Sequence, residues 1–287
     1  MKDYMLLIVA DLLLAGNFAI TKLYQNKAGT SVKAGFLFNA IVGLFTAAIF
    51  FVINGFSVAL TPYSLLMVVL KNVFCIAYII IGFKILKNQG IAIYTLFLMT
   101  GGMVVPYIWG LAFLNEVFSF WRLSGLIFII GGVAVSNFTD EKIKLKYLGL
   151  CILIFFLNGG VSVVSKLHSI ENTYATVSTN DFLVLGGIMT FVISGIGYFL
   201  AKPSEKREVN KGNILVIMAF SALLSGVSYM IQLTGAASLP ATVLYPFITG
   251  GSMIFSALAG RLFFKEKLTK NIIISLVLCF VGTLLFL

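Results

Sequence analysis

Two charged side chains lie inside long apolar stretches of this chain, where a charge needs either a function or a partner. Asp11 is the only acidic residue well inside such a stretch, and Lys71 is a basic residue inside another. A charge at the centre of a membrane-spanning helix costs about 2.5 kcal/mol or more, so it usually marks a functional site. Asp11 could therefore carry a coupling proton or bind a substrate.

A structural role competes with this functional one. Asp11 and Lys71 each lie seven residues after the start of an apolar stretch, at Tyr4 and Ser64, and both stretches enter from the same face. The two charges would then lie at similar depth and could form a buried ion pair between helices. A third alternative is that a long side chain extends to the membrane surface and keeps only its stem among the lipids.

The elements that must position these charges are ten apolar stretches separated by short polar loops. The 287 residues are 60% hydrophobic and 10% charged, with a mean hydropathy of +1.06, whereas a soluble domain carries about 25% charged residues. About 20 apolar residues cross the hydrocarbon core as a helix, and backbone groups in lipid must bond within the helix. We predict an all-α integral membrane protein with ten transmembrane helices. The predicted spans are Tyr4–Lys22, Ala34–Ile53, Ser64–Lys84, Ile91–Leu114, Arg122–Asn137, Tyr147–Lys166, Val177–Ala201, Gly212–Thr234, Ala241–Phe264 and Asn271–Leu287.

The positive charges are gathered in every second loop. Of the 20 Lys and Arg residues, only Lys2, Arg122 and Lys166 belong to the other face, and Lys71 lies within a span. The positive-inside rule then places the odd-numbered loops in the cytoplasm and both termini outside. Short loops without long tails are typical of a bacterial inner-membrane protein. The odd-loop residues are Lys22, Lys27, Lys33, Lys84, Lys87, Lys142, Lys144, Lys146, Lys202, Lys206, Arg207, Lys211, Arg261, Lys265, Lys267 and Lys270.

The same composition argues against several classes of protein. The formal charge of +10 is spread over short loops, so we expect no nucleic-acid partner. Three cysteines without paired spacing and the single histidine, His168, argue against a metal site. The chain has no P-loop motif and no cluster of catalytic groups, so we expect neither nucleotide-driven transport, nor an enzyme, nor a cofactor.

The chain also contains an internal repeat. A shift of 150 residues places Gly110 on Gly260 and Glu116 on Glu266, and a shift of 144 places Lys22 on Lys166. Each half has five spans, and an odd number inverts the second half relative to the first. Inverted repeats are typical of transporters, in which the site lies near the midplane and the halves rock around it.

The repeated charges have two interpretations each. Lys22 and Lys166 end equivalent helices on opposite faces, where they could anchor the helix at the headgroups or gate the two mouths of a pathway. Glu116 and Glu266 are expected to make helix-end contacts with a nearby Lys or Arg.

Three groups of residues occur in the same order in both halves of the chain. They are Ala15-Gly16-Asn17-Phe18 with Lys22, then Asn115-Glu116 and Lys265-Glu266, and the pairs Gly125/Gly132 and Ser275/Gly282. Their order resembles the ten-helix EamA-like branch of the drug/metabolite transporter superfamily over the whole chain. The first group lacks the Trp of that family's WG-N-F-x3-K pattern, and the second span lacks the Arg that relatives often carry.

The resemblance implies two EamA-like five-helix repeats, 1–140 and 141–287. It also implies that the third, fourth, eighth and ninth helices form a central wall, which favours Tyr94, Tyr229 and Tyr245. Each candidate could instead be a packing or interface residue, because Tyr gathers at headgroup level. The full set of substrate-binding or coupling candidates is Asp11, Asn17, Lys71, Tyr78, Tyr94, Asn158, Tyr229, Gln232 and Tyr245.

We therefore predict a secondary transporter of a small organic metabolite, such as an amino acid or an amphipathic drug. Its partners would be the solute and the lipid bilayer, and Asp11 is the candidate for proton coupling. The alternative is a membrane receptor or scaffold that transports nothing.

Overall fold

Ten α-helices make up the fold within the described part of the chain. The computed structural model describes residues 2–29, 31–89, 91–138, 145–201 and 211–287. The helices are α1 (Lys2–Ala28), α2 (Val32–Ile53), α3 (Pro62–Gln89), α4 (Ile91–Phe113), α5 (Phe120–Ser136), α6 (Leu145–Ile170), α7 (Thr179–Leu200), α8 (Lys211–Ser238), α9 (Ala241–Phe264) and α10 (Lys270–Leu284).

Eight of these helices are long and apolar enough to cross a membrane, and the chain is a multi-pass membrane protein. The other two, α5 and α10, have 17 and 15 residues. At about 1.5 Å per residue they are shorter than the roughly 30 Å hydrocarbon core. The prediction of helices is confirmed for all ten stretches, and membrane-spanning length is confirmed for eight.

Local capping explains where several helices begin and end. α1 continues past the predicted end at Lys22 to Ala28, and Gly29 then takes a φ of 89°, which favours glycine. α7 begins at Thr179 rather than Val177 because the Ser178 side chain accepts a hydrogen bond from the amide of Asp181. Thr269 caps α10 in the same way through the amide of Ile272.

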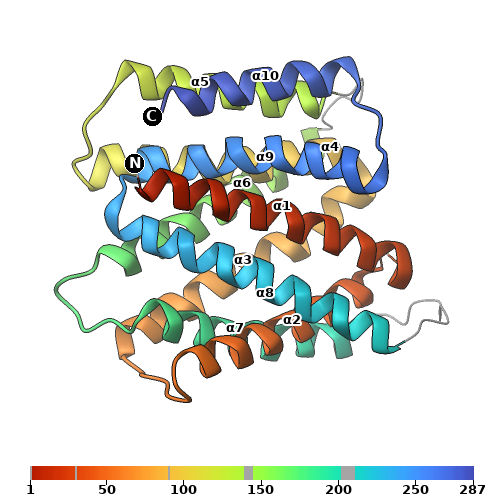
Figure 1. The fold of residues 1–287 in the computed structure, drawn as a ribbon, viewed down its shortest axis with the longest axis vertical. Helices are drawn as coiled ribbons and strands as arrows, with labels where there is room; N and C mark the ends of the chain where they lie inside the picture. The colour runs from red at the N-terminus through yellow and green to blue at the C-terminus, as the bar shows by residue number, and fades with distance from the viewer. Residues whose placement is uncertain (1, 30, 90, 139–144, 202–210) are drawn as a thin grey trace.

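Chain neighbours run in opposite directions, and both termini lie at one end of the bundle (Figure 1). We call this the terminal end, and we call the opposite end, which carries Lys27, Lys33 and Lys267, the lysine-rich end. The charge segregation seen in the sequence is thus a segregation between the two ends of the bundle. Lys142, Lys144, Lys202, Lys206 and Arg207 lie outside the described residues, as do the side chains of Lys87 and Lys211.

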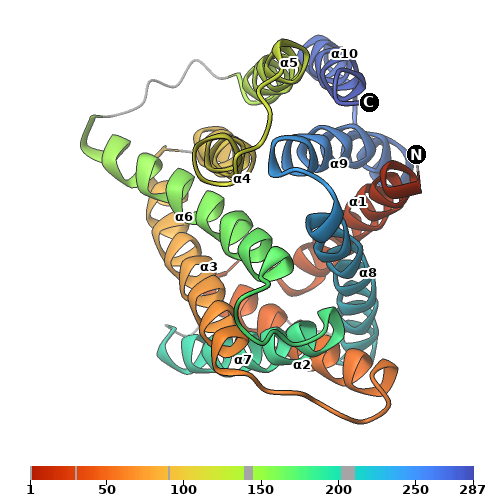
Figure 2. The same ribbon diagram turned by 90° about the vertical axis from the view of Figure 1, so that its left-hand side faces the viewer.

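The two halves of the sequence are interleaved rather than side by side. Every helix of the first half packs against at least one of the second, as in α1 with α8 and α9, and α2 with α7. Figure 2 shows the bundle from the terminal end, with α5 beside α10 at one edge and α2 beside α7 at the other. The predicted repeat boundary, between residues 140 and 141, lies outside the described residues.

Glycine brings two of these helix pairs into backbone contact. A Cβ on Gly187 of α7 would lie 2.6 Å from the carbonyl oxygen of Gly43 on α2, and a Cβ on Gly43 would lie 2.8 Å from that of Gly187. At the other edge, a Cβ on Gly125 of α5 would lie 2.8 Å from the carbonyl oxygen of Gly282 on α10. Small residues let helices approach closely where no water is available to drive association.

One apolar cluster is built mainly around α9, and a second is built mainly around α7. Leu244 and Phe247 of α9 pack with Met103 of α4 and Ile129 of α5, while Phe182 of α7 belongs to the second cluster.

Candidate functional site

A cavity of about 440 Å³, here called the central cavity, lies between the two halves. Its walls come from six helices, namely α1, α3 and α4 of the first half and α6, α8 and α9 of the second. Most of the wall is apolar, with a few polar groups, as is usual for sites that bind small molecules. The predicted candidates that line it are Tyr78, Asn158, Tyr229, Gln232 and Tyr245.

Hydrogen bonds between helices fix the wall around these residues. The Asn158 side-chain amide donates to the carbonyl of Leu98 on α4 at 2.7 Å, and the Tyr245 hydroxyl donates to the carbonyl of Ser162 on α6 at 2.6 Å. Tyr229 on α8 shares a 2.7 Å hydrogen bond with the Ser165 hydroxyl on α6. α6 is thereby tied to α4, α8 and α9, so the cavity is built into the packing rather than left between loose helices.

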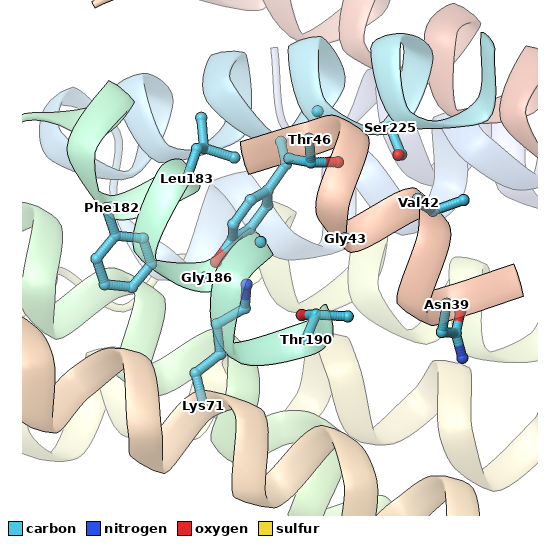
Figure 3. Close-up of a pocket in the computed structure, with 13 residues that line it drawn as sticks. Asn39, Val42, Gly43, Thr46, Lys71, Phe182, Leu183, Gly186, Thr190 and Ser225 are labelled. Carbon is cyan, nitrogen blue, oxygen red and sulfur yellow. The ribbon is translucent and has the colours of Figure 1, made fainter. Parts of the chain in front are cut away.

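A second cavity of about 220 Å³, the Lys71 cavity, opens beside the first. It is lined by α2, α3, α7 and α8, and it shares Ser225 and Tyr229 with the central cavity. Figure 3 shows the Lys71 side chain rising from α3 toward Gly186, with Thr190 beside it. The Lys71 ammonium lies 4.1 Å from the centroid of the Tyr229 ring, a cation–π contact.

Asp11 is not in either cavity and does not pair with Lys71. Its side chain is fully buried at the crossing of α1 and α9, where it packs against the backbone of Gly251. Among the residues that the structure describes, neither carboxyl oxygen has a hydrogen-bond partner. The ion pair considered from the sequence is therefore absent from the structure.

Asn17 and Tyr94, two further candidates, serve as contacts between helices. The side-chain amide oxygen of Asn17 accepts a 2.6 Å hydrogen bond from the Ser221 hydroxyl, which joins α1 to α8. Tyr94 packs its ring against Gly82 on α3, where a Cβ would lie 2.5 Å from the ring. Neither residue lines the two cavities described above.

The two repeated glutamates follow the same local turn. Asn115 and Lys265 both adopt a positive φ, 53° and 54°, and the next amide, of Glu116 or Glu266, bonds back to the carbonyl of Gly110 or Gly260. Glycine leaves room for this carboxylate, because a Cβ on Gly110 would lie 2.6 Å from the Glu116 carboxylate and displace it. The turn ends α4 and α9 and folds the glutamate back beneath the helix.

The partners of these glutamates differ between the two ends. At the lysine-rich end Glu266 forms an ion pair with Lys22, as expected. At the terminal end the Glu116 carboxylate instead accepts the amides of Ala241 and Thr242, at 2.6 and 2.8 Å, in the first turn of α9. These donors have no partner within the helix, and the helix dipole also favours an anion there.

Lys166 lies in the same terminal-end cluster. Its side chain is only 5% exposed, and its ammonium donates to the carbonyls of Ala236 and Leu239 at 2.6 and 2.7 Å. Anchoring at the headgroups, one of its two interpretations, is therefore wrong, because the ammonium is directed into the protein. Lys166 thus binds the end of α8, and Glu116 binds the amides at the start of α9. The two side chains hold the α8–α9 connection from both sides.

The second half of the chain is similar to a known protein family. The sequence model of the EamA-like transporter family matches residues 145–287. The second half of the chain belongs to the EamA-like transporter family. The resemblance seen in the sequence is thereby confirmed, and the family is one of membrane transporters of small solutes.

Solved structures share the fold of this EamA-like chain. One, described only as the crystal structure of a protein, superposes with a TM-score of 0.79 and covers 99% of this chain and 96% of its own. At 15% identity it shows a common fold alone. No curated protein matches the chain.

Sequence reasoning missed a polar network at the terminal end of this EamA-like chain. Asp181, in the first turn of α7, is 5% exposed and accepts hydrogen bonds from the Asn54 side chain at 2.7 Å and the Ala59 amide at 3.0 Å. It also accepts from Ser178, and Ser-x-x-Asp before an apolar run is the sequence signal of such a cap. The network fastens the α2–α3 connection to α7.

His168 and Glu171 complete this end of the bundle. His168 Nε2 lies 2.9 Å from the Ser64 hydroxyl, which in turn accepts the amide of Val177. Glu171 lies in the α6–α7 loop, where hydrogen bonds from the amides of Thr173 and Tyr174 lower the pKa of its carboxyl. These groups tie loops to helices and do not line either cavity.

Proposed function

We propose that the chain is a secondary transporter of a small organic metabolite, such as an amino acid or an amphipathic drug, that works by alternating access. The observation that carries the proposal is the central cavity, whose wall is built from helices of both halves. A cavity bounded by two movable bodies can open to one side when they tilt one way and to the other when they tilt back.

The packing supports two inverted repeats. When each helix is exchanged for its counterpart five positions along, α1 with α8 becomes α6 with α3, and α1 with α9 becomes α6 with α4; all of these pairs are in contact. The repeated turns at Glu116 and Glu266 agree with the same exchange. We propose 1–140 and 141–287 as the two repeats.

Two polar contacts are proposed as gates, one at Lys166 at the terminal end and one between Lys22 and Glu266 at the lysine-rich end. Opening the terminal end between α6 and α8 would break the Lys166 hydrogen bonds to Ala236 and Leu239. Opening the lysine-rich end between α1 and α9 would break the ion pair of Lys22 with Glu266. We place the lysine-rich end in the cytoplasm of a cell, by the positive-inside rule, and both termini outside.

Proton coupling through Asp11 is the second part of the proposal. A carboxyl group buried without a donor favours its neutral form, because burial of an unpaired charge is costly. Movement of α1 away from α9 would expose Asp11 to water and let it release a proton. Rocking of the halves would in this way be linked to protonation.

The residues of the central cavity are proposed to contact the solute. Asn158 and Gln232 supply amide groups, and Tyr78, Tyr229 and Tyr245 supply aromatic surface. Asn17 and Tyr94 would act indirectly, by holding α1 against α8 and α4 against α3.

Blocking the junction of the two cavities should abolish transport. Ser225 lines both cavities, and in Ser225→Phe a ring replaces a hydroxyl there, which should lower initial uptake by at least about tenfold. Uptake of labelled amino acids and of an amphipathic dye would be measured in proteoliposomes with an imposed pH gradient. Ser225→Ala should retain uptake, and Leu223→Phe, on an exposed position of the same helix, should too.

Two results would contradict this proposal. If Ser225→Phe folds and transports like the wild type, the cavity is not the pathway. If the wild-type chain is stabilised by a solute but moves none, a receptor explains the cavity better than a transporter.

A further inference from the structure

Lys71 places a positive charge within the bundle, and no anion of the described part of the chain pairs with it. Its side chain is half-buried, nine residues after the start of α3, which is roughly 14 Å along the helix. Within the described residues the ion pair of Lys22 with Glu266 is the only one, and no described group accepts a hydrogen bond from the Lys71 ammonium. Its nearest stabilising contacts are the rings of Tyr229 at 4.1 Å and Phe182 at 5.9 Å.

Such an arrangement is incomplete by itself. An ammonium group has three donors, and a lysine at the centre of a membrane helix is energetically costly unless it is paired or hydrated. Aromatic faces compensate part of this cost but accept no full hydrogen bond. The site therefore favours a ligand that brings an acceptor with negative charge.

The structure also leaves room for that ligand. Gly43, Gly186 and Gly187 line the Lys71 cavity and contribute no side chains to it. A Cβ on Gly186 would lie 3.9 Å from the Lys71 ammonium, so glycine keeps the approach to the charge open. Figure 3 shows Thr190 beside the ammonium, and its hydroxyl is held by the Asn72 side chain at 2.9 Å.

The connection to the central cavity indicates what the rest of the ligand would be. Ser225 and Tyr229 line both cavities, so a solute can lie across the junction. On the central side it would meet a largely apolar wall that includes Leu14, Phe18 and Leu233. The site thus combines a cationic end with an apolar and aromatic body.

We propose that the transported solute carries a carboxylate that binds Lys71, while its less polar remainder occupies the central cavity. The inference rests on the proposed function and narrows its substrate class to organic acids, amino acids included. A cationic amphipathic drug is disfavoured, because like charges repel strongly where the surroundings are apolar.

Matched probes test this proposal on the purified full-length chain. Phenylacetate and phenylacetamide have nearly the same shape and differ by one charge, and so do isovalerate and isovaleramide; phenethylamine supplies the cation. Thermal stabilisation would be titrated with each probe. The carboxylates should stabilise the wild type at lower concentrations than their amides, and phenethylamine should not stabilise it.

Substitution of the lysine should remove this preference. Lys71→Gln should raise the concentration of carboxylate required for half of the stabilisation by about tenfold or more, as expected for loss of a charge-assisted hydrogen bond. Lys71→Arg should retain the preference, which separates charge from folding if Lys71→Gln yields little protein. Lys27→Gln removes an exposed lysine of α1 and should change nothing.

The proposal is overturned if no carboxylate stabilises the wild type, if acids and amides act equally, or if Lys71→Gln binds carboxylates unchanged. The proteoliposome assay is independent of these results. If the chain takes up neutral or cationic solutes, and Lys71→Gln takes them up at the wild-type rate, the carboxylate site is overturned and the transporter assignment stays in place. If the wild-type chain takes up none of the solutes, the result would count against the proposed function instead.

Discussion

Gly187→Val should prevent α2 and α7 from packing and leave little folded protein. A Cβ at this position would lie 2.6 Å from the carbonyl oxygen of Gly43 and 2.7 Å from the amide nitrogen of Ala47. Both are backbone atoms, so the clash cannot be relieved by a change of rotamer. We expect a loss of at least about 3 kcal/mol, at the upper end of overpacking effects.

The measurement is the yield and thermal midpoint of purified protein in detergent. Gly195→Val is the matched control, because Gly195 lies on the same helix and nothing approaches its Cβ position within 4 Å. That control should behave like the wild type. Equal yields and midpoints for the two variants would mean that α2 and α7 do not cross in the close contact described here.

Asp11→Asn should uncouple transport from the pH gradient and leave exchange of solute intact. Asparagine has nearly the shape of aspartic acid, so the contact with Gly251 is preserved, but the side chain can no longer release a proton. In proteoliposomes the variant should exchange labelled for unlabelled solute at a rate close to that of the wild type. Accumulation driven by a pH gradient should fall to the level of empty liposomes.

The control for this experiment is Asp3→Asn, which removes a carboxyl from the first turn of the same helix. It should keep accumulation driven by the pH gradient. If Asp11→Asn accumulates solute like the wild type, the buried carboxyl is structural and coupling resides elsewhere. If both exchange and accumulation are lost while the protein remains folded, Asp11 contributes to solute movement itself.

The helices and their direction were predictable from the sequence because hydropathy and loop charge can be read along the chain, without knowledge of how the helices pack. Membrane-crossing length requires about 20 apolar residues, and the positive charges separate the two ends whatever the tertiary packing. The equivalence of the helix ends at Glu116 and Glu266 could also be seen in the sequence, since the repeat places the same Gly and Glu at both positions. Only their partners required the structure.

Lateral relations between helices were not predictable in this way. Asp11 and Lys71 were predicted to lie at similar depth in the membrane, but depth does not determine the direction in which each side chain points from its helix. The structure directs Asp11 toward Gly251 on α9 and Lys71 toward α7 and α8. Asn17 was chosen for its polarity, yet its partner, Ser221, lies 204 residues away in the sequence.

The missed site residue Ser225 is small and polar, and therefore inconspicuous. It has no unusual sequence context, and it becomes important only because two cavities meet beside it. Lys166 was a gating candidate, but it also looked like an interfacial lysine because it ends its predicted span. Its burial against α8 follows from the α8–α9 connection, which folds back across the end of α6.

Alternating access requires that the central cavity be reached from both sides of the membrane, and this can be tested directly. A single cysteine at Ser162, which lines the cavity, would be introduced after replacement of Cys75, Cys151 and Cys279 by alanine. Its reaction with a membrane-impermeant maleimide would be followed in right-side-out and inside-out vesicles. Alternating access predicts labelling from both faces, with pH or transported solute raising one labelling rate as it lowers the other. Labelling from a single face under every condition would contradict it.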